Sequence, residues 1–281
     1  MVKRFVEFFS MSYPSATAAN NEPRVAEAEK DPQFAYTLAK GLEVLRAFDV
    51  ASPALGNREI AQRTGIGRPT VVRLTRTLAL LGYLKYHEPT ARYRLAAPVL
   101  SFGYPLLCQL SVRQIARSHM QELADFARGA VSLAMRGGDQ LVLIETCVGK
   151  NAPSARPDVG ATRQFHDTSL GHTYYSATGK AERSEIDQIL QARHPEQWPV
   201  LRRSLAASQK SFLAKGYCIV PSPSTGVAAI SVPLSFLIDD ELLIMNCAVA
   251  QFHLQAETLE TQVAPRMLNL VRFLQTTTGR R

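Results

Sequence analysis

Residues 57–85 read NREIAQRTGIGRPTVVRLTRTLALLGYLK, and this segment constrains the fold more than any other. Two stretches with helical spacing of apolar residues are separated by the short connection TGIG. The first helix is expected to begin near Asn57, which can cap it, and to stop at Gly65 in a left-handed conformation. The second is expected to begin near Arg68, with Pro69 in its first turn, where no N–H is needed. Two helices joined by such a tight turn predict a helix-turn-helix.

The flanking sequence extends this unit to residues 35–97. A helix is predicted over about 36–49 from apolar residues that recur at helical intervals. These residues are Leu38, Leu42, Leu45 and Phe48. Downstream, the runs 83–86 and 92–95 flank the turn formers Glu88-Pro89-Thr90, which is typical of a β-hairpin. Three helices followed by a small hairpin predict a winged helix-turn-helix domain.

Positive charge is concentrated in this domain. The whole chain has a formal net charge of +8, and residues 56–95 alone hold eight basic and two acidic residues. No acidic residue occurs from 66 to 86. An ordinary solvated helix would mix Glu with Lys or Arg to gain pairs one turn apart, so the pattern argues against that alternative. A localised basic patch indicates a polyanionic partner.

The second helix of the motif has one apolar and one basic side at 100° per residue. The side expected to face the core comprises Val71, Leu74, Leu78 and Leu81. The planar fork of arginine suits phosphate oxygens and guanine edges, so we predict that the basic side enters the major groove of double-stranded DNA. The residues expected to contact DNA are Arg58, Arg68, Thr70, Val72, Arg73, Arg76, Lys85 and Arg92.

Outside this domain, the organisation follows from composition and periodicity. Residues 11–34 have no sustained hydrophobic period, and we expect residues 1–34 to form a flexible tail. Residues 98–110 are apolar, are interrupted by proline and glycine, and predict a linker. Residues 111–277 predict an α+β domain on an antiparallel sheet, with hairpins turning at GGDQ and IDDE.

Two helices of this second domain have identifiable apolar faces. The helix that opens the domain is expected to bury Ile115, His119, Leu123 and Phe126. The last helix is expected to bury Leu259, Val263, Met267, Leu270 and Leu274. Pro265 lies inside that helix and predicts a kink.

Several ordered segments together resemble the IclR-type bacterial transcriptional regulators. They are YTLAKGLEVLRAF, REIAQRTGIGRPTVVRLTRTLALLGYL, ARYRLAAPVLSFG, ARSHMQELAD, VSLAMRGGDQLVLIETC, VGATRQFHDTSLGHTYYSA and LLIMNCAVA, and they span about residues 35–276. The resemblance implies a winged helix-turn-helix domain followed by a GAF-like effector domain with a curved antiparallel sheet. It also implies a homodimer or homotetramer and a small organic-acid effector.

The resemblance also places the effector pocket on particular segments of the second domain. The residues it implies are Leu170, Gly171, His172, Thr173, Cys218, Asn246 and Cys247. The first of these open a helix, whose N-terminal N–H groups and dipole can hold a carboxylate, and His166 or His172 can add a charge-assisted bond. The chain departs from the family in its His172-Thr173 pair, and PSPSTGVAAISVPL lacks the family's acidic residues.

Signals for other classes of protein are weak. The segment ending in Gly179-Lys180 has Tyr174 where a phosphate-binding loop needs glycine, and no GxSxG nucleophile motif occurs. The four cysteines are far apart, with no ligand spacing for a metal, and Asp239-Asp240-Glu241 is interpreted as a turn. No apolar run reaches the roughly 18 residues of a membrane span, and Glu7 interrupts the apolar N-terminus. We therefore predict a cytoplasmic protein without enzymatic activity, cofactor, metal or membrane partner.

Two functional hypotheses remain at this stage. The first is a DNA-binding transcriptional regulator whose operator affinity changes when a small metabolite binds the second domain. The second is a small-molecule-binding or catalytic protein whose N-terminal domain only contacts other proteins. Salt dependence separates them, because a DNA-binding protein loses affinity steeply as salt rises.

Overall fold

The chain divides into two compact units, with the boundary between Gln109 and Leu110. The computed structural model describes residues 31–150, 152, 157–222, 227–238, 241–250 and 258–278. Most of the predicted tail, and Asp239 and Asp240 of the predicted second turn, lie outside these ranges.

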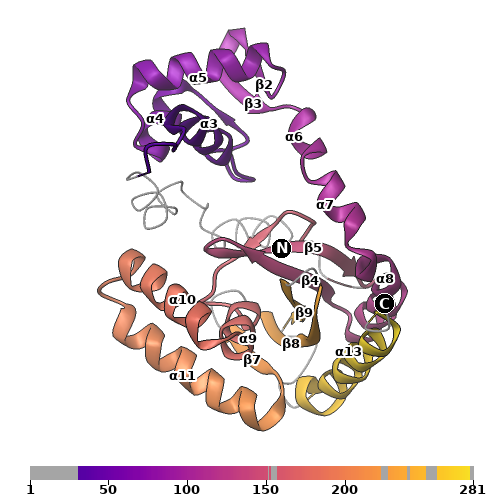
Figure 1. The fold of residues 1–281 in the computed structure, drawn as a ribbon. Helices are drawn as coiled ribbons and strands as arrows, with labels where there is room; N and C mark the ends of the chain where they lie inside the picture. Colours follow the sequence, from indigo (N-terminus) through magenta and orange to yellow (C-terminus); the bar gives the residue numbers. More distant parts are fainter. Residues whose placement is uncertain are drawn as a thin grey trace. The chain divides into compact units, whose positions relative to one another are not determined.

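The N-terminal unit is a winged helix-turn-helix (Figure 1, indigo to magenta). Its elements are α3 (Tyr36–Arg46), β1 (Ala54–Leu55), α4 (Asn57–Thr64), α5 (Arg68–Leu80), β2 (Leu84–His87), a 3-10 turn (Glu88–Thr90) and β3 (Arg92–Leu95). The strands form an antiparallel sheet in the order β1-β3-β2. One apolar cluster, which includes Val44, Ile60, Val71 and Leu84, joins the helices to the sheet.

The turn between α4 and α5 has the predicted stop at Gly65, whose φ is 68°. The predicted cap is wrong by one residue. Gly56 precedes the helix, and its N–H donates to Glu59 Oε2 at 2.8 Å. Asn57 instead accepts a bond from the hydroxyl of buried Thr75 at 2.9 Å. That bond ties the start of α4 to the middle of α5 and helps to fix the angle between them.

Two further features of this unit differ from the prediction. Strand β1, which pairs with β3, was not predicted, because two residues are too few to show the alternation of apolar and polar side chains that identifies a strand. Helix α3 buries Val44, but Leu38 and Leu42 of the predicted inner face are 65% and 52% exposed. The N-terminal half of α3 extends beyond the core, so its apolar residues remain uncovered within the chain.

The predicted linker, residues 98–110, contains two short helices, α6 (Pro98–Ser101) and α7 (Tyr104–Gln109). Pro98 and Pro105 stand in the first turns of these helices. At that position a proline starts a helix rather than interrupting one, because its missing N–H would have had no partner.

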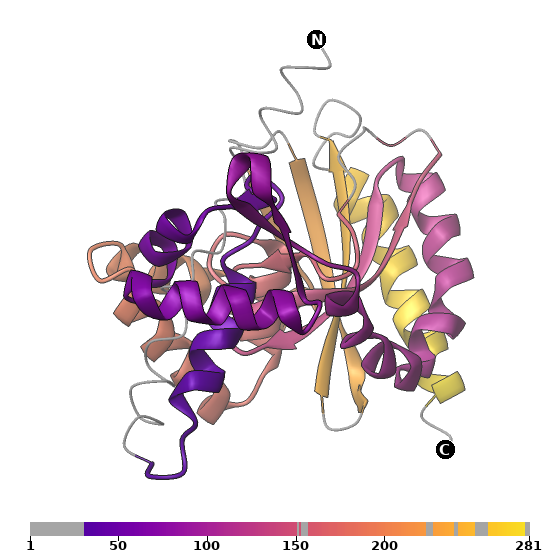
Figure 2. The same cartoon turned by 90° about the horizontal axis from the view of Figure 1, so that it is seen from above.

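The C-terminal unit is built on one antiparallel sheet in the order β6-β5-β4-β9-β8-β7. Its elements are α8 (Ser111–Ala127), β4 (Ala130–Gly137), β5 (Gln140–Val148), β6 (Thr162–Arg163), α9 (Ser169–Ala177), α10 (Lys180–Arg193), α11 (Trp198–Lys215), β7 (Cys218–Ser222), β8 (Val227–Ile238), β9 (Glu241–Ala250), a π turn (Leu259–Val263) and α13 (Ala264–Thr278). Helices α8 and α13 cover one face of the sheet, and α9 to α11 lie on the other (Figure 2).

Helix α8 buries a different face from the predicted one. The buried residues are Val112, Ala116, Met120, Leu123, Ala124 and Ala127. Of the predicted face only Leu123 is buried, and Phe126 is 43% exposed. Alanines let the helix approach the sheet closely, whereas a pattern search gives more weight to bulky side chains.

The predicted apolar face of the last helix is confirmed, because all five residues are buried. The predicted irregularity near Pro265 takes the form of a π turn. The Ala264 N–H donates to the carbonyl of Leu259, five residues earlier, just before a proline that cannot donate at all.

Candidate nucleic-acid interface and effector site

Helix α5 has one buried and one exposed side. Val71, Leu74, Thr75 and Leu78 are buried in the domain core. The predicted DNA-contacting residues of this helix are all exposed: Arg68, Thr70, Val72, Arg73 and Arg76. Leu81, predicted to face the core, is 62% exposed because the helix ends at Leu80 and Leu81 follows it.

The basic residues of this unit fall into two groups, and the first is occupied inside the protein. Arg63 donates to Asp49 at 2.6 Å, to the hydroxyl of Ser52 at 2.6 Å and to a backbone carbonyl. Arg92 donates to Glu59 at 2.9 Å and to the carbonyl of Ala54 at 2.7 Å. Arg92, predicted to contact DNA, therefore holds the start of β3 against β1 and α4.

The same contacts act on Glu59. The bond from the Gly56 N–H, together with the positive charge of Arg92, lowers the pKa of the Glu59 carboxyl. Glu59 is therefore ionised near neutral pH and anchors Arg92.

The second group has no internal partner. Among the described residues, no hydrogen bond or ion pair involves the side chains of Arg58, Arg68, Arg73, Arg76, Lys85 or Arg94, and all six are exposed. The side chains that are free to meet phosphate therefore include every basic residue predicted for DNA contact except Arg92. Arg94 joins them.

The hairpin supports this assignment. Lys85 of β2 lies directly opposite Arg94 of β3, so both cations project from the same face of the sheet. On the other face, the rings of Tyr86 and Tyr93 lie 4.8 Å apart and help to pack the wing. Like charges directly opposite each other destabilise a strand pair, and an anion between them would relieve the repulsion.

The residues implied for an effector site, apart from Cys247, lie at and around the start of α9, and that start is closely packed. The Thr168 hydroxyl caps the helix by accepting a bond from the Gly171 N–H at 3.0 Å. A Cβ on Gly171 would lie 2.3 Å from the Cα and carbonyl oxygen of Phe165, so only glycine fits without a shift. Leu170 is buried in the apolar cluster beneath this helix.

Next to α9, a row of small polar side chains crosses the sheet. Thr146, Ser132, Asn246 and Ser231 are successive cross-strand neighbours on β5, β4, β9 and β8. Ser169 donates to Asn246 Oδ1 at 3.0 Å, and Ser231 Oγ lies 2.9 Å from that same oxygen. Only Asn246 of this row was predicted, because single serines in apolar strands give no sequence signal.

Thr173 and His172 of the predicted set are both held by bonds within the domain. Thr173 donates to the carbonyl of Ser231 at 3.2 Å. His172 Nε2 lies 2.9 Å from the His166 carbonyl, which can only accept, so Nε2 carries the proton. His172 Nδ1, 2.6 Å from the Ser208 hydroxyl, then accepts. Burial lowers the pKa of His172, which is consistent with a neutral ring.

The two predicted cysteines lie on opposite faces of the sheet. Cys218 lies 3.9 Å from the Ser176 hydroxyl on the α9 side, and Cys247 follows Asn246 and therefore points toward α8 and α13. Burial raises the pKa of the Cys218 thiol and raises that of Cys247 to about 12. Both thiols are protonated at neutral pH, which does not suit a nucleophile.

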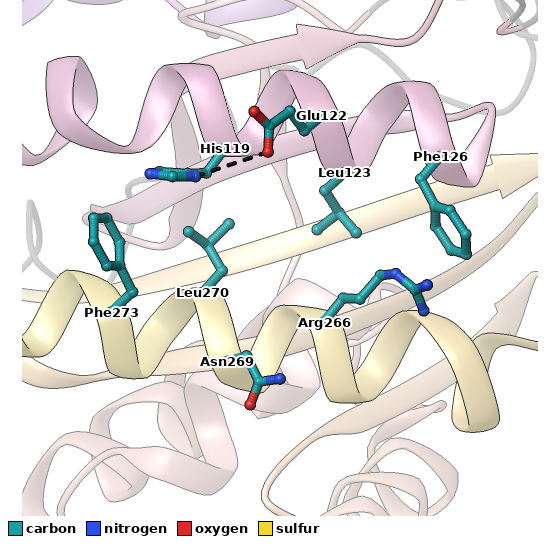
Figure 3. Close-up of a pocket in the computed structure, with 8 residues that line it drawn as sticks. All are labelled: His119, Glu122, Leu123, Phe126, Arg266, Asn269, Leu270 and Phe273. Carbon is teal, nitrogen blue, oxygen red and sulfur yellow. Dashed lines mark ion pairs between the residues drawn. The ribbon is translucent and has the colours of Figure 1, made fainter.

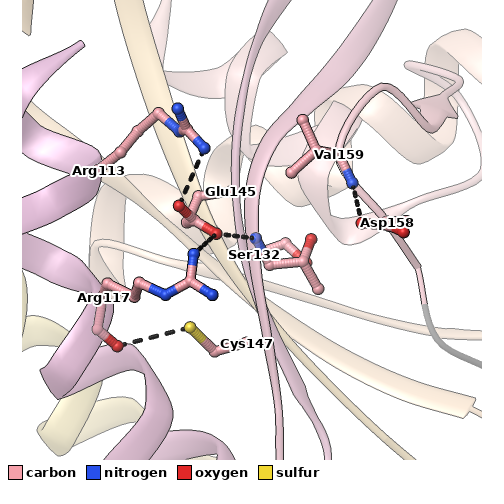
Figure 4. Close-up of polar contacts among 8 residues, drawn as sticks. Arg113, Arg117, Ser132, Glu145, Cys147, Asp158 and Val159 are labelled. Carbon is pink, nitrogen blue, oxygen red and sulfur yellow. Dashed lines mark hydrogen bonds and ion pairs between the residues drawn. The ribbon is translucent and has the colours of Figure 1, made fainter. Parts of the chain in front are cut away.

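A buried charged cluster on the α8 side was not predicted. Glu145 is 3% exposed and accepts bonds from Arg113 at 3.1 Å and Arg117 at 3.2 Å (Figure 4). Ile144 has no partner on β4, and this extra residue reverses the alternation so that Glu145 faces α8. One acidic residue in the apolar run LVLIETC is the sequence signal that was available.

The described residues contain neither a metal-binding cluster nor a membrane-spanning helix. No group of three or more histidine, cysteine or acidic side chains there is arranged to hold a metal ion. Every helix in the same ranges is too short or too polar to cross a bilayer.

In one chain, a winged helix-turn-helix with six exposed cations that have no partner among the described residues is followed by a separate sheet domain, and this combination defines a class of protein. It is the class of two-domain, DNA-binding transcriptional regulators.

The family within this class is established by similarity to known proteins. Residues 37–88 match the model of the IclR helix-turn-helix domain, and residues 105–241 match the model described as bacterial transcriptional regulator IclR C-terminal. The chain belongs to the IclR family of transcriptional regulators, which are not enzymes.

Three relatives illustrate the similarity. An IclR family transcriptional regulator from Brucella abortus is 36% identical, with a TM-score of 0.80 over 89% of this chain and 95% of that one. The Pca regulon regulatory protein of Pseudomonas putida is 28% identical over 92% of each chain. An IclR homologue from Microbacterium hydrocarbonoxydans, solved in complex with 4-hydroxybenzoate, is 20% identical, with a TM-score of 0.60 over 84% of this chain and 99% of that one.

Proposed function

We propose that this regulator binds an operator through α5 and the wing, and that a small organic acid bound in its C-terminal unit changes its operator affinity. DNA binding is supported by the six exposed cations that have no partner among the described residues. Arg73 and Arg76 would contact bases or phosphates from the middle of α5. Arg68, Thr70, Arg58 and Lys85 would position the domain on the backbone, and Val72, 44% exposed, would contact a thymine methyl.

The effector would bind on the α9 side of the sheet. The polar row that ends at Ser231 and Asn246 supplies buried hydroxyl and amide groups on that face of the sheet. His166 Nδ1 lies buried near the start of α9 and has no hydrogen-bond partner among the described residues. An aromatic acid is the class we favour, because a distant relative was solved with 4-hydroxybenzoate. We place the regulator in the cytoplasm, where bacterial DNA lies.

A homodimer would present two copies of α5 to successive major grooves, about 34 Å apart. The uncovered apolar residues of the N-terminal unit support this part of the proposal. Leu38 and Leu42 lie on α3, and Leu100, Phe102 and Tyr104 lie in or beside the two short linker helices. A second copy of the chain would cover these residues, because helix-turn-helix domains commonly bind an operator as a dimer.

The test compares two arginine variants of the full chain on an operator selected from a random DNA library. Arg73→Ala is expected to weaken binding at least about fivefold, since a lost bidentate contact costs about 1–3 kcal/mol. Arg203→Ala, on exposed α11, is the matched control and should bind like wild type. Equal binding by Arg73→Ala and the control would contradict the assignment. In the same assay, 4-hydroxybenzoate should shift the wild-type midpoint and shift that of Asn246→Ala less.

A further inference from the structure

Glu145 is a buried charge that the proposed effector site does not use. Its carboxylate accepts bonds from Arg113 at 3.1 Å and from Arg117 at 3.2 Å (Figure 4). The Arg113 side chain is 17% exposed, whereas that of Arg117 is 65% exposed. A buried ion pair often adds no stability over apolar side chains of similar size, since both charges lose their hydration. A role in positioning explains this cluster better than a role in stability.

The cluster holds the first two turns of α8. Arg113 and Arg117 are the third and seventh residues of this helix, which begins directly after the linker. The C-terminal half of the helix has a different neighbour, α13. There the Arg266 guanidinium lies 3.8 Å from the centre of the Phe126 ring (Figure 3). Glu145 therefore fixes the end of α8 that continues into the linker.

The strand that carries Glu145 also carries one end of the polar row. On the α9 side of the sheet, the hydroxyls of Ser132 and Thr146 lie 3.1 Å apart. Thr146 is half-buried, whereas the other three members of the row are buried. The Thr146 N–H donates to Glu145 Oε1 at 3.1 Å, and the extra residue Ile144 sets this register. One carboxylate therefore holds both the backbone of the row and the start of α8.

We propose that Glu145 is a positioning residue that transmits effector binding from the polar row to α8. This inference rests on the effector site proposed above. A ligand bonded to the Thr146 hydroxyl would shift the backbone of this strand, and with it the carboxylate that Arg113 and Arg117 share. The first turns of α8 would follow. The change would then reach the linker, because a single residue separates α7 from α8.

A purely structural role for the cluster predicts a different outcome. Loss of the ion pair would then lower the free energy of unfolding, and the two faces of the sheet would stay independent. Transmission predicts instead that a change on the α9 face alters the start of α8, and that cutting the ion pair removes this effect. A double-mutant cycle measures the difference.

Hydrogen exchange of the full chain, followed by mass spectrometry, tests transmission without any effector. Ser132→Ala removes the bond to Thr146 on the α9 face. Exchange in residues 111–117, on the other face, should become faster by about twofold or more. Residues 120–127 of the same helix should keep the wild-type rate, which excludes global unfolding as the cause.

A second serine and a second background complete the cycle. Ser176→Ala is the matched control, because it removes a buried hydroxyl of α9 that lies outside the polar row, and it should leave residues 111–117 at the wild-type rate. In an Arg117→Gln background, Ser132→Ala should no longer change exchange there. A wild-type rate in Ser132→Ala, or an equal effect in both backgrounds, would overturn the proposal. If Ser132→Ala loses its thermal unfolding transition, Thr146→Val removes the same bond from its other end and serves instead.

Operator titrations separate this inference from the proposed function. With saturating 4-hydroxybenzoate, the wild-type midpoint should shift by about fivefold or more, and that of Arg117→Gln should shift less. Glu122→Gln, an exposed change on the same helix, should shift like wild type. No shift in wild type would contradict the proposed effector, and the exchange result would still decide this inference. Equal shifts in wild type and Arg117→Gln would contradict this inference alone.

Discussion

At the residue scale, identical side chains take opposite roles according to their neighbours. The side chain of Arg63 is 23% exposed and makes three bonds to groups inside the domain, whereas Arg73 is exposed and its side chain has no hydrogen bond or ion pair among the described residues. Charge in the sequence therefore identifies the basic domain but not the arginines that are free. Asp49 and Ser52 bind Arg63, and Glu59 binds Arg92. These partners lie at least 11 residues away in the sequence, so a helical wheel does not identify them.

The buried histidines at the start of α9 predict how stability depends on pH. Burial lowers the pKa of His172 and of His166, so the folded state binds fewer protons than the unfolded state just below the ordinary value of about 6.5. Stability is therefore complete above that value and should fall as pH drops from 6.5 toward the lowered pKa values. Urea unfolding between pH 7.5 and 5.5 measures the slope. His172→Gln should flatten it, and an unchanged slope would contradict this account.

At the element scale, hydrophobic periodicity predicted where helices and strands occur better than it predicted which face of each helix is buried. The helix-turn-helix and the wing follow from spacing and turn residues, so they could be placed from sequence. The inner faces of α3 and α8 could not, because each helix also has apolar residues that the chain leaves exposed. The polar row and Glu145 depend on strand register and on the irregularity at Ile144, which arise only when distant strands pair.

Two glycine substitutions test the packing of single helices. Gly171→Ala in α9 should lower the melting temperature, because the new Cβ would meet Phe165 at 2.3 Å and the backbone there would have to move. Gly41→Ala in α3 is the matched control, with nothing within 4 Å of its Cβ. It should stabilise the helix by about 1 kcal/mol. Calorimetry would measure the melting temperatures of both variants, and a Gly171→Ala variant that melts at or above the wild-type temperature would contradict the close contact.

At the scale of the whole molecule, the two units differ in where they hold polar and charged groups. The N-terminal unit leaves six of its cations exposed, while the C-terminal unit buries polar groups beneath α9 and a charged cluster beneath α8. Because α8 follows directly after α7, a change at the sheet that moved α8 would reach the linker without crossing an unrelated element. The proposed linkage between effector and operator is expected to amount to about 1–3 kcal/mol.

The wing gives the last prediction, because it links charge repulsion in the free protein to affinity in the complex. Lys85 and Arg94 lie directly opposite each other, so Arg94→Ala removes a like-charge pair and should leave the melting temperature unchanged or slightly higher. In a dimer the same change removes two phosphate contacts. The slope of log K against log salt should therefore become shallower by about 2, since each contact contributes about 0.9. Operator titrations from 50 to 200 mM salt, with Arg203→Ala as the control, measure both affinity and slope. A wild-type slope in Arg94→Ala would place the wing away from the DNA backbone, and the repulsion between its two cations would then need another explanation.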